Sequence, residues 1–179
     1  MKNRASAIVP GNPATRLRIA TEADTSFTRE LFKTSRAGEF AAIGLPPAAL
    51  DTLLEQQFRA QGAGYAAQFP DAHSLIVCWH DGPVGRLIVS IGERRWRIID
   101  ILLLPAVRGR GVGSDLIDAV ARAAREHGAH DLVLTVLSTN AEARRLYLRL
   151  GFTETGEGTH IEMTKRLIEQ TTGPHPSLE

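Results

Sequence analysis

The chain has 179 residues, of which 43% are hydrophobic and 23% are charged, and its formal net charge is +1. These values indicate a soluble globular protein with a sizeable core. A net charge this close to zero excludes a general electrostatic attraction of the whole chain to nucleic acid or to a membrane surface. Cys78 is the only cysteine, which excludes an internal disulfide and favours a reducing, cytoplasmic setting. No apolar run has the length that a signal peptide or a membrane span requires.

The limits of the hydrophobic periodicity predict the domain organisation of the chain. Residues 1–14 combine prolines with little hydrophobic periodicity, so we expect a flexible arm there. Residues 15–168 are expected to form one domain. The polar, proline-containing residues 169–179 are expected to form a flexible tail.

The first elements of the domain are a strand and a helix. Alternation of apolar and charged residues predicts a strand over Thr15–Ala20. Thr21 and Asp24 have the spacing of a capping box, which predicts a helix that runs through Phe32. Residues 35–45 contain two glycines and are expected to form a loop.

A long helix is predicted from Pro46 to Phe69, where apolar residues form a stripe at helical spacing. Gly62 and Gly64 each weaken a helix by about 1 kcal/mol relative to alanine. We therefore expect a kink or a break near these two glycines.

From residue 74 the hydrophobic period changes to two, which is typical of strands. Three apolar runs at hairpin distances predict an antiparallel meander: Ser74–Trp79, Val84–Ile91 and Trp96–Leu104. Later elements are predicted to be a helix at Val112–His127, a strand at Asp131–Leu137, a helix from Asn140 to Leu150, and a closing hairpin of Phe152–Thr155 and Thr159–Lys165. A strand-helix-strand unit of this length should be parallel and right-handed.

The segment around residues 98–118 has the order strand, glycine turn, helix. The strand stops at Pro105, and the turn over Arg108–Gly113 contains three glycines and two arginines. The first turn of a helix has backbone N–H groups without internal partners, and the helix dipole places partial positive charge there, so such a turn binds phosphate. The simpler alternative is a tight turn with solvated arginines. The turn lacks the Gly-Lys-Ser/Thr ending of a P-loop, and its third glycine comes one residue early for a dinucleotide fingerprint.

Two sequence blocks carry a family resemblance. Arg108, Gly111 and Gly113 have the spacing Arg-x-x-Gly-x-Gly, and the segment NAEARRLYLRLGF, from Asn140 to Phe152, has the pattern Asn-x-x-Ala-x-x-Leu-Tyr-x-x-x-Gly-Phe. Together they resemble the acetyl-CoA-binding signature of the GNAT superfamily of N-acetyltransferases. The resemblance is close over residues 98–164 and only approximate before them.

This resemblance implies a fold and a cofactor. The fold is a mixed α/β (α+β) sheet of six or seven mostly antiparallel strands, with one parallel strand-helix-strand unit and flanking helices. The co-substrate is acetyl-CoA, without a metal, and its pantetheine arm adds to the central strand like a short edge. The implied cofactor-binding residues are Ile101, Leu102, Leu103, Arg108, Gly109, Arg110, Gly111, Val112, Gly113, Ser114, Asn140 and Tyr147.

The resemblance also implies catalytic roles. Tyr147 matches the family's general acid, which protonates the departing thiolate, although a tyrosine on an amphipathic helix is also an ordinary core residue. Asp100 interrupts an apolar strand, so its carboxylate must be paired, hydrated or functional, and we take it as the candidate base. Glu93 acting through water, or a water chain with no dedicated side chain, are the alternatives, and His160 ranks behind Asp100.

The acceptor site is implied only in outline. In the resembled family the helices after the first strand wall this site, so Gln57, Gln61 and Tyr65 become candidates for contact with the acceptor, beside the simpler explanations of core packing and solvent exposure.

The expected function is transfer of an acetyl group from acetyl-CoA to a primary amine of a small molecule or a protein, by direct attack. The alternative is a non-catalytic module that binds or senses acyl-CoA. Nucleic-acid binding through the clustered arginines is disfavoured because no aromatic residues are interleaved with them. A homodimer is possible, and six scattered histidines show no metal-ligand pattern.

Overall fold

The computed structural model describes residues 4–40 and 44–168, and its centre is a seven-stranded mixed sheet. The strands are β1 (Thr15–Ile19), β2 (His73–Trp79), β3 (Gly82–Ile91), β4 (Arg95–Leu103), β5 (Asp131–Leu137), β6 (Thr153–Glu154) and β7 (His160–Arg166). They follow the order β1-β2-β3-β4-β5-β7-β6, and every neighbouring pair is antiparallel except β4 and β5. The predicted mixed sheet with one parallel unit is confirmed. The tail predicted at 169–179 lies outside the described residues.

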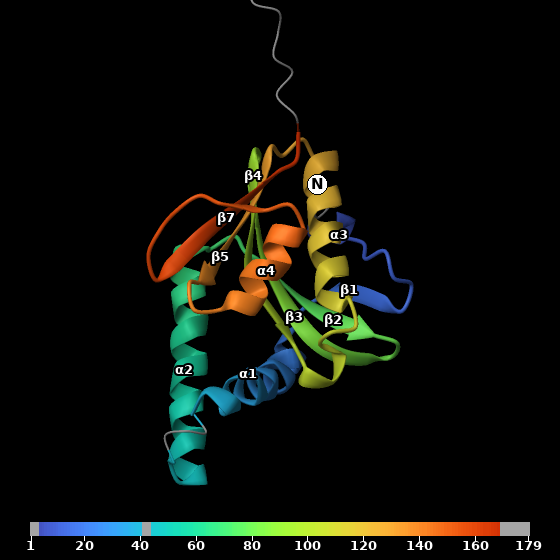
Figure 1. Ribbon diagram of the computed structural model, residues 1–179. Coiled ribbons are helices and arrows are strands. Elements are labelled where there is room, and N and C mark those ends of the chain that lie inside the picture. Colours follow the sequence, from blue (N-terminus) through green and yellow to red (C-terminus); the bar gives the residue numbers. More distant parts are fainter. Residues whose placement is uncertain (1–3, 41–43, 169–179) are drawn as a thin grey trace, which may run out of the picture.

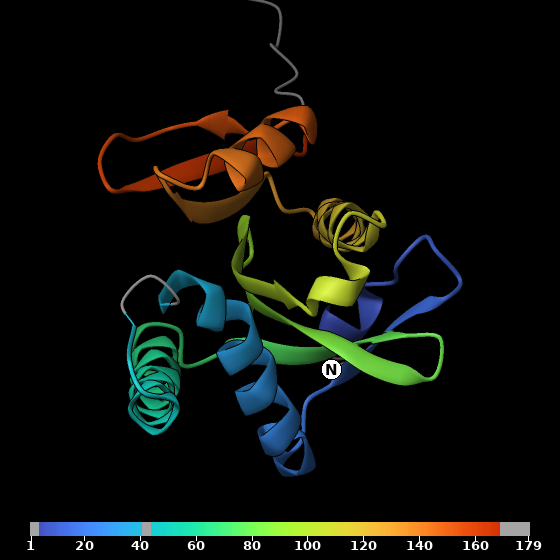
Figure 2. The same cartoon turned by 60° about the horizontal axis from the view of Figure 1, so that its bottom comes forward.

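Four α-helices and three short 3₁₀ helices complete the described part of the chain. They are η1 (Arg4–Ala7), η2 (Glu22–Asp24), α1 (Thr25–Phe40), α2 (Pro47–Gln68), η4 (Pro105–Val107), α3 (Val112–Glu126) and α4 (Ala141–Arg149). Figures 1 and 2 show α1 and α2 on one side of the strands β2–β4, with α3 and α4 on the other. Among the described residues, no helix is both long and apolar enough to cross a membrane.

The main core lies between the sheet and α3. The helix buries Val112, Leu116, Ile117, Val120 and Ala124, which are the positions that helical spacing predicts, against the buried side chains of β3, β4 and β5. Burial of each large aliphatic side chain contributes about 1.5–3 kcal/mol. The glycine turn therefore precedes a rigid, well-anchored helix.

The second face of the sheet is covered by α1. Leu31 and Phe32 of this helix are buried, as are Ile76 and Ile88 of the strands beneath it, and these residues lie outside the main core cluster. Strand alternation explains the division, because successive side chains of β3 point to opposite faces. Ile88 consequently shares its face with Arg86, while Leu87 and Val89 join the main core.

Two predictions about the helices before β2 are wrong. The expected loop at 35–45 is helical as far as Phe40, and α2 continues through Gly62 and Gly64 without a break. A Cβ atom at either glycine would meet nothing within 4 Å, so neither glycine serves a close approach. Packing of α1 against α2 and the good helix formers on either side of the glycines outweigh a cost of about 1 kcal/mol for each. The predicted capping box is present, because the backbone N–H of Thr21 donates to Asp24 Oδ2 at 2.8 Å.

The N-terminal segment packs against the domain, which differs from the expected flexible arm. Ala5 and Ile8 are buried in the main core. The carboxylate of Asp115 in α3 accepts hydrogen bonds from the backbone N–H groups of Gly11, at 2.7 Å, and Asn12, at 3.1 Å. These partners are more than 100 residues apart in the sequence, so local periodicity gives no sign of the contact.

Candidate active site

The parallel pair β4 and β5 separates along its length. Pairing runs from Arg95 opposite Asp131 to Ile98 opposite Leu134 and ends there, although both strands continue for at least three residues. On its other edge, β4 remains paired with β3 as far as Leu103, with one extra residue, Ile99, at a bulge. The last residues of β4 thus have one paired edge and one open edge.

The open edge presents backbone groups of Leu103. The N–H of Leu104 donates to the carbonyl of Val84 at 2.9 Å, and successive N–H groups in a strand point in opposite directions, so the N–H of Leu103 points away from β3. The carbonyl of Leu103 accepts a hydrogen bond from Arg108 Nε at 3.0 Å. This end of β4 is therefore tied to the start of the glycine turn.

The turn between β4 and α3 suits an anion. Gly109 and Gly111 have φ angles of 70° and 82°, which other residues rarely adopt, and Gly111 is the N-cap of α3. The cap provides no side-chain acceptor for the first N–H groups of this 15-residue helix. A Cβ atom at either glycine would meet nothing within 4 Å, so no neighbouring group crowds the turn at these positions. The geometry fits a phosphate group of a cofactor.

The two arginines of the turn are exposed but held in place. Besides the bond from Arg108 to β4, the guanidinium of Arg110 lies 5.2 Å from the ring centroid of Trp79, at the end of β2. Such a cation–π contact contributes about 0.5–1 kcal/mol at an exposed site. Arg108 and Arg110 are therefore exposed, as the alternative of a tight turn with solvated arginines predicts, but each also contacts another part of the protein.

Tyr147 reaches the candidate site from α4. The helix begins at Asn140, whose Oδ1 accepts from the N–H of Ala143 at 3.1 Å, and the ring of Tyr147 packs 5.9 Å from that of Phe152. Burial raises the pKa of the Tyr147 phenol, and the negative charge of Asp100 raises it further. The carboxylate of Asp100 on β4 is therefore near enough to Tyr147 on α4 for its charge to act on the phenol.

Asp100 is the centre of a polar cluster on the face that α1 and α2 cover. Its Oδ2 accepts a hydrogen bond from Arg86 Nη2 at 2.6 Å, and the same Nη2 donates to Gln61 Oε1 at 3.2 Å. Burial also raises the pKa of Tyr65 on α2, followed by the charge of Asp100, while Arg86 acts in the opposite direction. We call Gln61, Tyr65, Arg86 and Asp100 the polar cluster.

Sequence reasoning singled out Asp100, Gln61 and Tyr65 but missed Arg86. The available signal was a charge within the apolar run Val84–Ile91, which is the argument that identified Asp100. The side chain of Arg86 is only 9% exposed.

The other sequence candidates are not part of the polar cluster. Glu93 is exposed in the turn that precedes β4, at the opposite end of this strand from Leu103. His160 is exposed and lies opposite Leu137, at the end of β5 that diverges from β4. Gln57 is half-buried one helical turn before Gln61.

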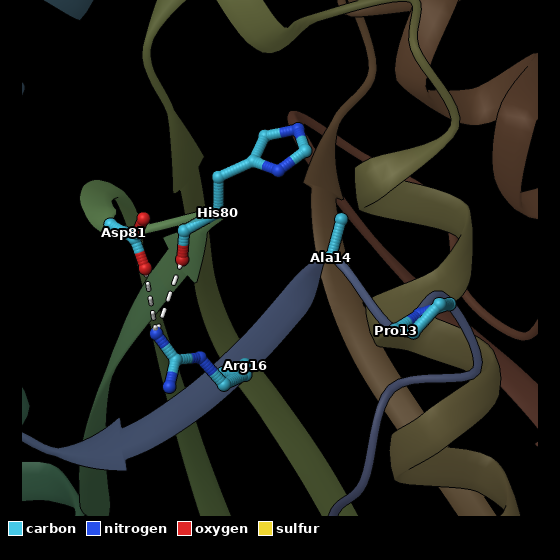
Figure 3. Close-up of a pocket in the computed structure, with 5 residues that line it drawn as sticks. All are labelled: Pro13, Ala14, Arg16, His80 and Asp81. Carbon is cyan, nitrogen blue, oxygen red and sulfur yellow. Dashed lines mark hydrogen bonds and ion pairs between the residues drawn. The ribbon is translucent and has the colours of Figure 1, made fainter.

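Two surface hollows lie away from these residues. One, of about 320 Å³, is lined by Pro13, Ala14, Arg16, His80 and Asp81, and Figure 3 shows Arg16 bonded to the carbonyl of His80 and paired with Asp81. The other, of about 480 Å³, is formed by residues 154–157. Neither contains Tyr147 or Asp100.

Comparison with known proteins adds independent findings. Residues 44–152 match the family model described as acetyltransferase (GNAT) family. The chain is 32% identical over 138 residues to a streptothricin acetyltransferase of Streptomyces lavendulae, covering 72% of each chain. It is 31% identical over 124 residues to an aminoalkylphosphonate N-acetyltransferase of Salmonella typhimurium, covering 63% of this chain and 76% of that protein.

A similar solved structure is the PaiA N-acetyltransferase of Thermoplasma acidophilum in complex with coenzyme A. Its TM-score is 0.66 at 15% identity, over 85% of this chain and 98% of that one. Such a low identity shows the fold alone. Both sequence blocks, in the glycine turn and in α4, fall within the residues that match the family model.

Proposed function

Because the chain belongs to the acetyltransferase (GNAT) family, we propose that it acetylates the primary amine of a small molecule, with Tyr147 as the general acid. Family membership makes it an acetyl-CoA-dependent acyltransferase that acts on amines. The relatives named for streptothricin and for aminoalkylphosphonates favour a small molecule over a protein as the acceptor. The observation that carries the proposal is the open edge of β4, which leads into the glycine turn at the start of α3.

In this proposal the glycine turn holds the cofactor's diphosphate. The N–H groups of Gly111, Val112, Gly113 and Ser114 bind the phosphate oxygens, and Arg108 and Arg110 add positive charge. The open-edge residues Ile101, Leu102 and Leu103 pair with the pantetheine arm. Asn140 fixes the start of α4 and so the position of Tyr147.

The chemistry requires three groups of the chain. Bound acetyl-CoA supplies an activated acetyl group, whose C–S bond breaks as a C–N bond forms. The N–H of Leu103 donates to the acetyl oxygen where negative charge develops. Tyr147 donates its proton to the departing thiolate, and Asp100 receives the proton that the amine loses, directly or through water.

The raised pKa of Tyr147 bears on the protonation state of its phenol. A phenol with a pKa above its ordinary value of about 10 stays protonated at neutral pH. The partial burial of the ring, together with its contact with Phe152, restricts the orientation of the hydroxyl group.

Release of free CoA from acetyl-CoA tests the proposal, measured over a wide panel of primary amines with mass analysis of the products. We expect acetylated amine and free CoA in equal amounts. Calorimetry with acetyl-CoA alone gives the control, since the non-catalytic alternative predicts tight binding with no turnover on any amine. That outcome would replace the enzyme by a binding module.

A further inference from the structure

Arg86 is a buried cation whose hydrogen-bonding capacity is only partly used. The residue is 7% exposed, and both hydrogen bonds in the structure come from Nη2, to Asp100 and to Gln61. Its Nε is buried without a partner in the described part of the chain. Buried polar groups are nearly always satisfied, so the guanidinium of Arg86 has capacity for a further acceptor beyond Asp100 and Gln61.

Arg86 occupies only one carboxylate oxygen of Asp100, so the other oxygen can bind a second cation. Arg86 engages Oδ2, whereas no side chain or backbone group is bonded to Oδ1 in the described residues. The side chain of Asp100 is 18% exposed, so Oδ1 can be reached from solvent. A primary amine arrives as an ammonium ion at neutral pH, which a carboxylate binds well.

From these unused groups we infer that the polar cluster selects short zwitterionic acceptors, with the ammonium group at Asp100 and a carboxylate or phosphonate at Arg86. The inference rests on the proposed function and adds the substrate class. A guanidinium suits this role because its fork of N–H donors matches the oxygens of such anions. Arg86 and Asp100 are in direct contact, so the two charges of the acceptor must be separated by only a few bonds.

Two neighbours support this assignment. Gln61 ties the guanidinium to α2, which fixes its position relative to β4. Tyr65, on α2, belongs to the same cluster, and the charge of Asp100, after burial, raises the pKa of its phenol.

Four matched amines test the inference: 2-aminoethylphosphonate, β-alanine, propylamine and 1,3-diaminopropane. Each has a primary amine at one end of a short chain, and the group at the other end is a phosphonate, a carboxylate, a methyl group or a second primary amine. Of the phosphonate and the carboxylate, we expect the better substrate to have a kcat/KM at least ten-fold above that of propylamine. The two acids distinguish a phosphonate site from a carboxylate site. Equal use of propylamine, or a preference for the diamine, would overturn the inference.

Variants of Arg86 separate recognition from folding. Arg86→Gln is expected to abolish the preference for acids, so that the ratio of kcat/KM for the acidic amines to kcat/KM for propylamine falls to about one. Arg86→Lys keeps the charge beside Asp100 and the fold but loses the fork, so it should retain only part of the preference. Arg94→Gln, at an exposed position in the turn before β4, is the matched control and should behave as wild type.

Calorimetric binding of acetyl-CoA shows that each variant is folded. A preference that survives in both Arg86 variants would contradict the inference while leaving the acetyltransferase proposal intact. The proposed function fails separately, if no amine of the wide panel is acetylated.

Discussion

The two tyrosines of the chain, Tyr65 and Tyr147, come from different helices and both respond to the charge of Asp100. We expect Tyr147→Phe to lower kcat roughly ten-fold or more, because it removes only the hydroxyl group that donates the proton. The affinity for acetyl-CoA, measured by calorimetry, should stay nearly unchanged. Tyr65→Phe is the matched control and should retain most of kcat. Unchanged turnover in Tyr147→Phe would identify that residue as a core aromatic only.

The same pair allows a direct test of the electrostatics. Ultraviolet absorbance at high pH reports tyrosinate, and this chain has only two tyrosines to titrate. Burial is the main cause of both raised pKa values, and the carboxylate of Asp100 is the next, since it disfavours a second negative charge nearby. Asp100→Asn should therefore move both titrations to lower pH without returning them fully to about 10. Midpoints that do not move would contradict the proximity of Asp100 to the phenols.

At the residue scale, sequence reasoning found one half of the ion pair. Asp100 was a candidate because a charge within an apolar strand needs a reason, and the same argument applies to Arg86. The charge of an arginine is a weaker signal, because its long aliphatic stem lets it occur in half-buried strands. Only the register, with Asp100 opposite Ile88 two residues from Arg86, shows that the two side chains share one face.

The glycine turn gives a test at the scale of one element. Gly111 has a φ of 82°, so Gly111→Ala is expected to destabilise the protein by about 1–2 kcal/mol. Gly113 lies inside α3, where a Cβ atom would make an ordinary contact with Leu103 Cδ1 at 3.7 Å. Gly113→Ala should leave stability unchanged or raise it by up to about 1 kcal/mol. Denaturant unfolding of the apoprotein measures both.

The affinity of Gly113→Ala for acetyl-CoA tests whether the glycine turn binds phosphate or is only a tight turn. If the diphosphate approaches the N–H of Gly113, the added methyl group of Gly113→Ala should raise KM for acetyl-CoA about ten-fold, or ~1.4 kcal/mol, in a fully stable protein. A turn without a phosphate role predicts normal KM in this variant. The second result would remove the glycine turn from the cofactor site.

Elements with strong local signals were predicted well. The strand Asp131–Leu137 was predicted with its observed limits, and the helix that starts at Val112 differs by one residue at its end. The region before β2 was predicted less well, because glycines there argued for breaks that helix packing overrides. The opening between β4 and β5 was not predictable from periodicity, since both strands continue beyond their last pair.

At the scale of the whole molecule, the N-terminal segment makes long-range contacts that could not be predicted from the sequence. Its partners include Asp115 and Arg122 in α3, whose Nη2 donates to the carbonyl of Val9 at 2.9 Å. Contacts across more than 100 residues leave no local pattern. These contacts are made to α3, the helix that starts at the glycine turn, so the segment also helps to hold the proposed cofactor site in position.

Two adjacent residues of this segment decide between a flexible arm and a packed one. Ile8 is 3% exposed in the main core, whereas Val9 is 64% exposed. We expect Ile8→Ala to cost about 2–4 kcal/mol, because it removes buried methyl groups and leaves a cavity. In a chain of this size that loss lowers Tm by roughly 4–16 °C. Val9→Ala should stay within about 0.5 kcal/mol of wild type. If calorimetric melting gives the same Tm for both variants and wild type, residues 4–14 do not pack against α3 in solution.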